Sequence, residues 1–184
     1  ASGISTKEWQ RLIQDPNFPL INKAIQNAYP PGSVFKIVTL AAALDTGLTN
    51  TDEIFEDKGV YRYGGWDFYG WETKGLGKLN VVEGLGWSSD PVFYELGRRL
   101  GIQKLADYVY IFGLGEKTGI GLQGETAGVV PTEEWKAKNI GEPWYGGETV
   151  IAAIGQGYYL ATALQHAMLL MAVANGGIMY RPML

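Results

Sequence analysis

The sequence contains no cysteine and only one histidine among its 184 residues. Without cysteine there is no disulfide, no thiol nucleophile and no thiolate ligand for zinc. Unless another chain contributes residues, this composition argues against Cys/His zinc proteins, cysteine-dependent enzymes and Ser-His-Asp hydrolases. The absence of cysteine leaves the redox compartment of the protein open.

The sequence also lacks any excess of positive charge. Fifteen lysines and arginines stand against 19 aspartates and glutamates, a formal net charge of −4, and the basic residues form no blocks. This distribution argues against nucleic acid as a partner.

Long apolar runs are missing as well. The longest, Ala167 to Ala174, is far shorter than the roughly 18 residues of a membrane helix. The first residues, Ala1-Ser2-Gly3-Ile4, contain neither the methionine nor the basic and apolar regions that open a secretory signal. We therefore expect no membrane span here, and a chain that is an internal part of a longer protein.

What the sequence does contain is glycine and aromatic residues. Its 26 glycines, six tryptophans and 11 tyrosines indicate many loops anchored by large side chains, because glycine normally makes up only about 7% of a protein. The length suits one domain or part of one. Helical periodicity and capping signals predict helices over 7–14, 34–44, 81–85, 91–100, 102–112, from Thr132 onward and over 159–174. Loops are expected over 113–130 and 139–149, and a long excursion with a hairpin over 48–80.

A hydroxyl and an ammonium group stand three residues apart in Ser33-Val34-Phe35-Lys36. At the first turn of a helix this spacing places both on one face, where a nucleophile and its base can meet. The apolar helix that follows is expected to bury Lys36 and lower its pKa. An isolated pair of this kind often arises by chance, but the rigid turn Pro30-Pro31-Gly32 and the apolar helix favour a functional role here.

Ser88-Ser89-Asp90 offers a second hydroxyl and a carboxylate. Two interpretations stay open at this point. The segment could supply polar groups to a site, or Asp90 could simply be the N-cap of a helix that has Pro91 at its first position.

Three other features have simpler explanations than catalysis. Lys117-Thr118-Gly119 matches a motif of penicillin-recognising enzymes, but it lies in a glycine-rich loop where that motif requires a strand. His166 is expected to be a hydrogen-bonded histidine of a helix. The tyrosines and tryptophans of 61–71 could line a groove for a sugar or peptide, but a packed aromatic cluster is the commoner outcome.

Taken together, these motifs resemble the transpeptidase domain of class B penicillin-binding proteins, most of all its elongation-type branch, penicillin-binding protein 2. The resemblance covers essentially the whole chain. It rests on the ordered segments Pro19-Leu20-Ile21-Asn22-Lys23-Ala24, Tyr29-Pro30-Pro31-Gly32-Ser33-Val34-Phe35-Lys36, Trp87-Ser88-Ser89-Asp90, Phe112-Gly113-Leu114-Gly115, Gly155-Gln156-Gly157-Tyr158 and Asn175-Gly176-Gly177.

The resemblance implies an α+β fold of the penicillin-binding protein and serine β-lactamase type. This chain would be mainly its helical lobe with small hairpins, so that residues 1–184 are a partial transpeptidase domain. The central antiparallel sheet, the strand that carries the third motif, the pedestal and the membrane anchor would lie outside it. The expected location is the extracytoplasmic face of the bacterial cytoplasmic membrane.

The same resemblance assigns roles to four residues. Ser33 would be the acylated nucleophile, Lys36 its base and Ser88 a proton relay to the leaving amine, while Asp90 stands where many relatives have asparagine. No cofactor or metal is implied. The implied ligands are peptidoglycan stem peptides and β-lactams, and the implied protein partner is a cell-wall polymerase of the elongation machinery.

Two alternatives remain. A serine β-lactamase or penicillin sensor would share the fold and the Ser33–Lys36 pair, but a hydrolase needs a second base to activate water. A non-catalytic module that binds glycan or peptide through the aromatic residues of 61–71 belongs to a different functional class.

Overall fold

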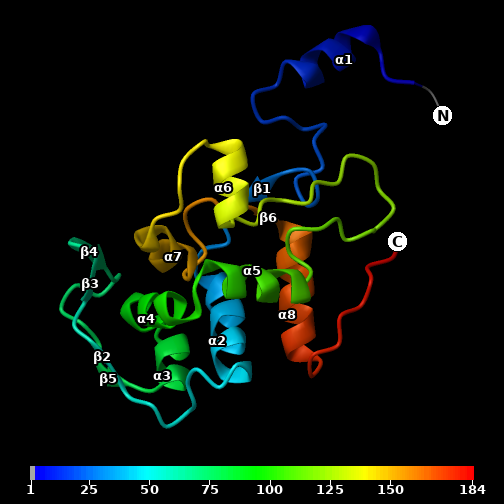
Figure 1. The fold of residues 1–184 in the computed structure, drawn as a ribbon. Helices are drawn as coiled ribbons and strands as arrows, with labels where there is room; N and C mark the ends of the chain where they lie inside the picture. Colours follow the sequence, from blue (N-terminus) through cyan, green and yellow to red (C-terminus); the bar gives the residue numbers. More distant parts are fainter. Residues whose placement is uncertain (1–2) are drawn as a thin grey trace.

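The computed structural model describes residues 3–184 as a set of helices with three small two-stranded sheets (Figure 1). The helices are α1 (Thr6–Ile13), the 3₁₀ helix η1 (Gly32–Phe35), α2 (Lys36–Asp45), α3 (Val81–Gly86), α4 (Asp90–Leu100), α5 (Ile102–Ile111), α6 (Glu133–Asn139), α7 (Gly146–Ala152) and α8 (Ala163–Ala174). The strands are β1 (Ala28–Tyr29), β2 (Phe55–Asp57), β3 (Val60–Tyr63), β4 (Trp66–Tyr69), β5 (Gly77–Leu79) and β6 (Ala161–Thr162).

Helix α2 occupies the centre of the fold and packs against both α4 and α5. Its apolar residues point to two sides. Val38 belongs to a core cluster with residues of α5 and α8, whereas Leu40 belongs to a second cluster with residues of α4, β2 and β5. A helix that is apolar on most of its faces needs this central position, because each apolar face must be buried away from water.

Side-chain caps begin most of the helices. Ser5, Asn80, Ser89, Thr132 and Thr162 each accept a hydrogen bond from a backbone N–H in the first turn of the helix that follows. These bonds satisfy N–H groups that have no partner within the helix. The expectation that Thr132 caps a helix is confirmed.

The segment over residues 48–80 forms two strand pairs. β3 and β4 make a hairpin in which Tyr63 is opposite Trp66 and the turn is Gly64-Gly65. Both glycines have positive φ, 60° and 83°, which is what a two-residue turn of this hand requires. β2 pairs with β5 and closes the segment onto α4. The prediction of strands within residues 55–78 is therefore confirmed. The segment contains two strand pairs, however, where a single hairpin is predicted.

Two expectations about helices are wrong. Residues 146–152 form α7 where only loop was expected, because Gly146 and Gly147 hide the helical pattern. The last helix begins at Ala163 rather than Tyr159, because Ala161 and Thr162 pair with Tyr29 and Ala28 in a short sheet. That pairing joins segments more than 130 residues apart, so no local pattern indicates it.

Glycines allow the close packing around α2. A Cβ at Gly97 of α4 would come 2.1 Å from the Cβ of Ala153, and a Cβ at Gly155 would come 2.4 Å from the carbonyl oxygen of Gly32. Only a residue without a side chain fits at either contact. Through them α7 and the residues after it pack tightly against α4 and against η1.

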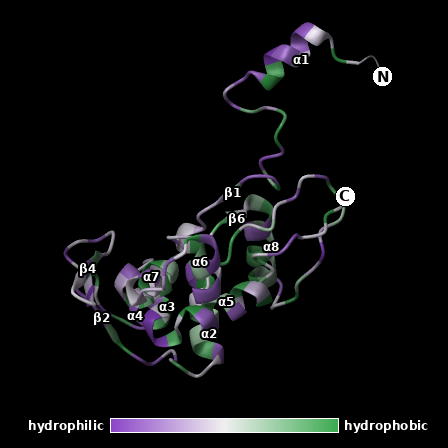
Figure 2. Cartoon of the chain, turned by 45° about the horizontal axis from the view of Figure 1, so that its top comes forward, coloured by the Kyte–Doolittle hydropathy of each residue, from purple (hydrophilic) through white to green (hydrophobic). Residues whose placement is uncertain are grey.

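Helix α1 stands apart from the other helices (Figure 1). None of its residues is buried, and Figure 2 shows hydrophilic and hydrophobic residues side by side along it, whereas α8 is mostly hydrophobic. No helix within residues 3–184 has both the length and the apolar character needed to cross a membrane.

Candidate active site

Ser33 lies in the first turn of η1, directly before the central helix. The turn that carries it is fixed from behind, since the Gly32 N–H donates a hydrogen bond of 2.9 Å to the carbonyl oxygen of Gly155. Gly32 has a φ of +59°, a conformation that glycine adopts readily. The Ser33 side chain is exposed. The nucleophile predicted from the sequence is therefore held on a rigid turn and open to a ligand.

Lys36 begins α2 and is completely buried, with 0% of the residue exposed. Its ammonium group donates hydrogen bonds to the Ser88 carbonyl oxygen at 2.7 Å, to Ser88 Oγ at 2.9 Å and to Asp90 Oδ1 at 2.6 Å. The ring of Phe93 lies 5.5 Å from Nζ. Three polar contacts and an aromatic face thus hold one lysine, as a buried ammonium requires.

Ser88 connects the lysine to the nucleophile. Its Oγ lies 3.1 Å from Ser33 Oγ and 2.9 Å from Lys36 Nζ. Among the described residues the hydrogen bonds of the Lys36 ammonium go to Ser88 and Asp90, and none goes to Ser33. The predicted direct meeting of Ser33 and Lys36 is therefore replaced in this structure by a link through Ser88. Spacing along one helix cannot indicate a third residue that comes from the turn between α3 and α4.

Burial lowers the pKa of Lys36, and the nearby carboxylates of Asp90 and Asp57 oppose this without cancelling it. The net direction is downward, as the sequence predicts. A lysine whose pKa is lowered is neutral more of the time near physiological pH, which is what a proton acceptor requires.

Asp90 is not the N-cap of α4. Ser89 occupies that position, and its Oγ accepts the Val92 N–H at 3.4 Å, while Asp90 is the first residue of the helix. The interpretation of Asp90 as an ordinary cap is therefore wrong. The cap hydroxyl comes from Ser89, so the Asp90 carboxylate is free to bind Lys36.

The turn that carries Ser88 is unusual. Ser88 has a φ of +54°, one of two positive values among the described non-glycine residues, a conformation that needs support from its surroundings. Trp71 Nε1 donates to the Trp87 carbonyl oxygen at 3.1 Å, and Ser89 Oγ donates to Asp57 Oδ2 at 2.6 Å. Sequence reasoning missed Asp57, and it assigned Trp71 to an aromatic groove or cluster rather than to the support of this turn. Asp57 could be found only from the structure, because its burial follows from its place in β2, where Phe55 and Asp57 are buried and Glu56 is exposed.

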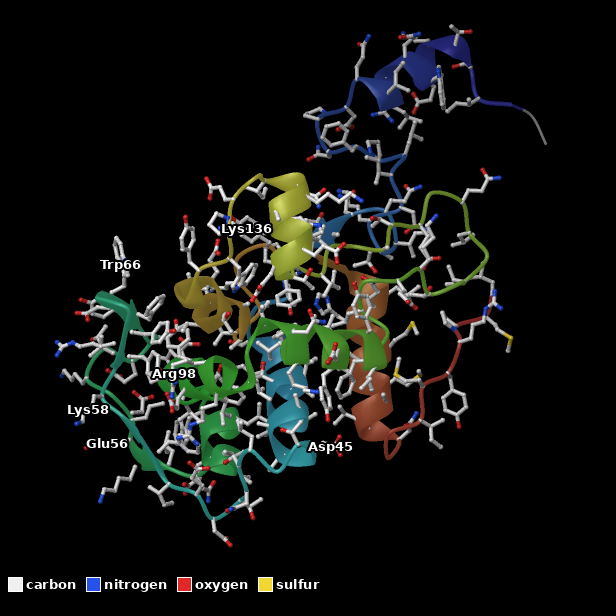
Figure 3. The ribbon with its side chains drawn as sticks, viewed as in Figure 1. Asp45, Glu56, Lys58, Trp66, Arg98 and Lys136 are labelled. Carbon is white, nitrogen blue, oxygen red and sulfur yellow. The ribbon has the colours of Figure 1, made fainter. Side chains whose placement is uncertain are left out.

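The aromatic residues of 61–71 divide between packing and exposure. Tyr61 and Phe68 pack near Tyr94 of α4, with ring centroids 6.0 Å and 5.8 Å from it. Trp66 is 73% exposed and projects from the hairpin tip in Figure 3. A cavity of about 820 Å³ lies between this hairpin and the start of α7. It is lined by Tyr63, Trp66, Phe68, Tyr145 and Ile151 among others. The packed cluster expected from the sequence is thus present, and a cavity lies beside it; its use for a sugar or peptide stays a prediction.

Two other candidates lie outside this constellation. Lys117-Thr118-Gly119 is loop, as expected, and its Thr118 and Gly119 backbone N–H groups bind the Glu125 carboxylate. His166 lies in α8, but the expected hydrogen bond is missing. Its Nε2 is buried without a partner among the described residues, and burial lowers its pKa.

The arrangement is suited to covalent catalysis by serine. An exposed hydroxyl, a second hydroxyl and a buried amine form a connected chain from Ser33 through Ser88 to Lys36, and Asp90 completes it. Such a chain can move the proton of a serine nucleophile. Within residues 3–184 no three histidine, aspartate or glutamate side chains gather as metal ligands would.

The chain is similar to known proteins in both sequence and structure. Residues 4–184 match the model of the penicillin binding protein transpeptidase domain. The chain is 40% identical over 182 residues to the peptidoglycan D,D-transpeptidase MrdA of Escherichia coli (strain K12), covering 98% of this chain and 29% of that protein. PBP2 of Pseudomonas aeruginosa has a TM-score of 0.93 at 36% identity, covering 98% of this chain and 42% of that one. PBP2 of Helicobacter pylori, solved in complex with MreC, has a TM-score of 0.93 at 35% identity, covering 98% and 34%.

Proposed function

Because this chain belongs to the penicillin-binding protein transpeptidase family, we propose that the protein containing it is a peptidoglycan D,D-transpeptidase of the elongation type. The observation that carries the proposal is the hydrogen-bonded chain from Ser33 through Ser88 to Lys36. The chain spans less than a third of the length of MrdA, so the activity belongs to the longer protein.

In the first step Ser33 Oγ attacks the carbonyl carbon of the amide between the two terminal D-alanines of a stem peptide. Neutral Lys36 accepts the Ser33 proton through Ser88, since Ser88 Oγ lies within hydrogen-bond distance of both. The C–N bond then breaks, the departing amine takes up a proton by way of Ser88, and D-alanine leaves. An ester on Ser33 remains.

In the second step the amine of a neighbouring stem peptide attacks that ester. A new amide bond forms, the amine loses a proton to Lys36, and Ser33 recovers its own. A β-lactam would acylate Ser33 in the same way but leave an ester that persists. Both steps pass through a tetrahedral oxyanion, which needs preorganised donors. The Ser33 backbone N–H is one; we place the second donor, the third motif and the central antiparallel sheet outside this chain.

The rest of the proposal concerns the surroundings of the enzyme. We place it at the extracytoplasmic face of the bacterial cytoplasmic membrane, anchored by a segment outside residues 1–184. Helicobacter pylori PBP2 forms a complex with MreC, and a relative of 34% identity belongs to a peptidoglycan synthase complex that coordinates polymerization and crosslinking. These two complexes support a role in an assembly with a cell-wall polymerase.

The test is acylation of the full-length protein by a fluorescent penicillin. We expect the wild type to be labelled and Ser33→Ala to remain unlabelled, because Ser33 is the exposed hydroxyl at the outer end of the chain that leads through Ser88 to Lys36. Ser5→Ala, a change at the cap of the separate helix α1, is the matched control and should label normally. Labelling of Ser33→Ala at the wild-type rate contradicts the proposal.

The lifetime of the acyl-enzyme separates a transpeptidase from a β-lactamase. A lactamase must activate water with a second base, so its ester turns over within seconds. We expect the ester on Ser33 to persist for many minutes, followed as retained fluorescence after excess penicillin is removed. Rapid loss of the label assigns the protein to the lactamase class instead.

A further inference from the structure

A buried carboxylate lies next to the turn that carries Ser88. Asp57 ends strand β2 and is only 3% exposed. Side chains alternate along a strand, and here Phe55 and Asp57 are buried while Glu56 between them is exposed. Asp57 therefore points inward, toward α4, at a position where an apolar residue would normally pack.

Asp57 accepts a hydrogen bond on each of its carboxylate oxygens. The Gly59 N–H donates to Oδ1 at 2.7 Å, and Ser89 Oγ–H donates to Oδ2 at 2.6 Å. Ser89 is itself completely buried. Both partners of Asp57 are donors, which is the environment that a carboxylate without a proton needs. Charge-assisted hydrogen bonds of this length are among the stronger ones in proteins.

The bond to Ser89 acts directly on the turn that carries Ser88. Ser89 follows Ser88, whose positive φ directs both its carbonyl oxygen and its hydroxyl toward Lys36. Released from its anchor, a non-glycine residue in this conformation relaxes to a commoner one. Ser88 would then lose contact with Ser33 or Lys36.

Asp57 also acts on Lys36 through its charge. Two carboxylates face the Lys36 ammonium. Asp90 binds it directly, and Asp57 raises its pKa from a greater distance. These two are the charged groups that oppose the lowering of the Lys36 pKa by burial. The remaining neighbour on α4, Phe93, contributes only its ring face.

We propose that Asp57 is a positioning residue of the acylation reaction, which holds the Ser88 turn through Ser89 and keeps Lys36 in its hydrogen-bonded place. The inference rests on the proposed function, because it assumes that Ser33 is acylated. Strand β2 would thereby support acylation, although it is remote in sequence from all four predicted site residues.

The test compares Asp57→Asn, Ser89→Ala and the double variant in the full-length protein, with Glu56→Gln as matched control. Glu56 is next to Asp57 but exposed, and it pairs with Lys58 at the surface (Figure 3). The measurement is the rate constant for acylation by a fluorescent penicillin as a function of pH, together with thermal unfolding.

For Asp57→Asn we expect one effect that slows acylation and a second that extends acylation to lower pH. The plateau rate falls about 10- to 100-fold, the cost of a displaced catalytic group. The acid limb of the profile moves to lower pH, because the lost negative charge lowers the pKa of Lys36 further. Ser89→Ala lowers the plateau without moving the limb, since it keeps the charge of Asp57. The double variant is no slower than the slower single variant, because Ser89→Ala removes the Ser89–Asp57 bond and Asp57→Asn weakens that same bond by removing the charge of its acceptor.

A purely structural role would reduce the melting temperature and the plateau but leave the acid limb in place. Asp57→Asn with an unmoved limb, or additive plateau losses in the double variant, overturns the proposal. If Asp57→Asn does not fold, the test rests on Ser89→Ala. A plateau rate constant of Ser89→Ala within about twofold of wild type then contradicts the proposal. Failure of the proposed function is distinct, because the wild type would then not be acylated at Ser33 at all.

Discussion

At the scale of single residues, the most demanding feature is a fully buried ammonium whose partner, Asp90, is the first residue of another helix. Removing one member of a buried ion pair leaves an uncompensated charge, which typically costs about 3–5 kcal/mol. Loss of Asp90 is therefore expected to destabilise the folded protein and to change the proton affinity of Lys36. The first of these effects depends on pH.

We predict that Asp90→Asn destabilises the folded protein more at pH 7 than at pH 10. The variant removes the group that raises the Lys36 pKa, so that pKa falls further below its usual value of about 10.4. Between the two values the unfolded chain binds a proton that the folded chain does not, and stability rises with pH. At high pH a neutral Lys36 no longer needs its partner.

The measurement is thermal unfolding of wild type and variant at both pH values. Asp67→Asn serves as control, because Asp67 pairs with Arg62 at the surface, where the two side chains are 39% and 77% exposed and such pairs contribute about 0–1 kcal/mol. An equal loss of stability at both pH values in Asp90→Asn contradicts the prediction.

At the scale of secondary-structure elements, the site depends on how closely three helices approach. Helix α2 carries the lysine, α4 carries the aspartate, and α7 leads to the residue that fixes the turn before Ser33. Gly97 brings α4 against Ala153 at the end of α7. The position of that glycine therefore affects the site although it lies a full two turns from Asp90.

We predict that Gly97→Ala destabilises the protein by about 1–3 kcal/mol, the usual cost of overpacking a core. The added Cβ would lie 2.1 Å from the Cβ of Ala153, so the two elements must separate. Gly86→Ala is the control, since a Cβ there meets nothing within 4 Å and should be neutral or stabilise by about 0.4–1 kcal/mol. Chemical unfolding of both variants checks the prediction. A Gly97→Ala variant as stable as wild type would show that α4 and α7 can shift freely.

At the scale of the whole molecule, the described residues expose apolar side chains on two separate helices. Trp9 and Ile13 of α1 are 45% and 46% exposed, and Leu170 and Val173 of α8 are 46% and 52% exposed. Exposed apolar surface on a helix face favours contact with further protein. The solved relative from Pseudomonas aeruginosa is more than twice as long as this chain, which covers 42% of it.

We predict that residues 1–184 alone are acylated at Ser33 much more slowly than the longer protein. In the proposed mechanism the Ser33 N–H is the oxyanion donor within the chain and the second donor lies outside it, and losing one donor costs about 10²- to 10³-fold in rate. The measurement is penicillin labelling of the isolated chain, with and without the remainder of the protein added in trans. Labelling of the isolated chain at the full rate would show that the site is complete within these residues.

Much of the local structure follows from the sequence alone, and so do the candidate site residues. Caps such as Thr132 and stops such as Gly101 mark helix ends because their effects involve only neighbouring residues. The pair Ser33 and Lys36 follows from helical spacing, and the burial of Lys36 follows from the apolar residues after it.

The way in which these parts meet depends on long-range packing. Ser88 lies between Ser33 and Lys36, Ser89 rather than Asp90 caps α4, and Asp57 anchors the turn from a strand more than 30 residues away. The strand pair that shortens α8 joins residues near both ends of the chain. Each of these contacts depends on packing between elements distant in sequence, and local periodicity contains no information about which distant elements will touch.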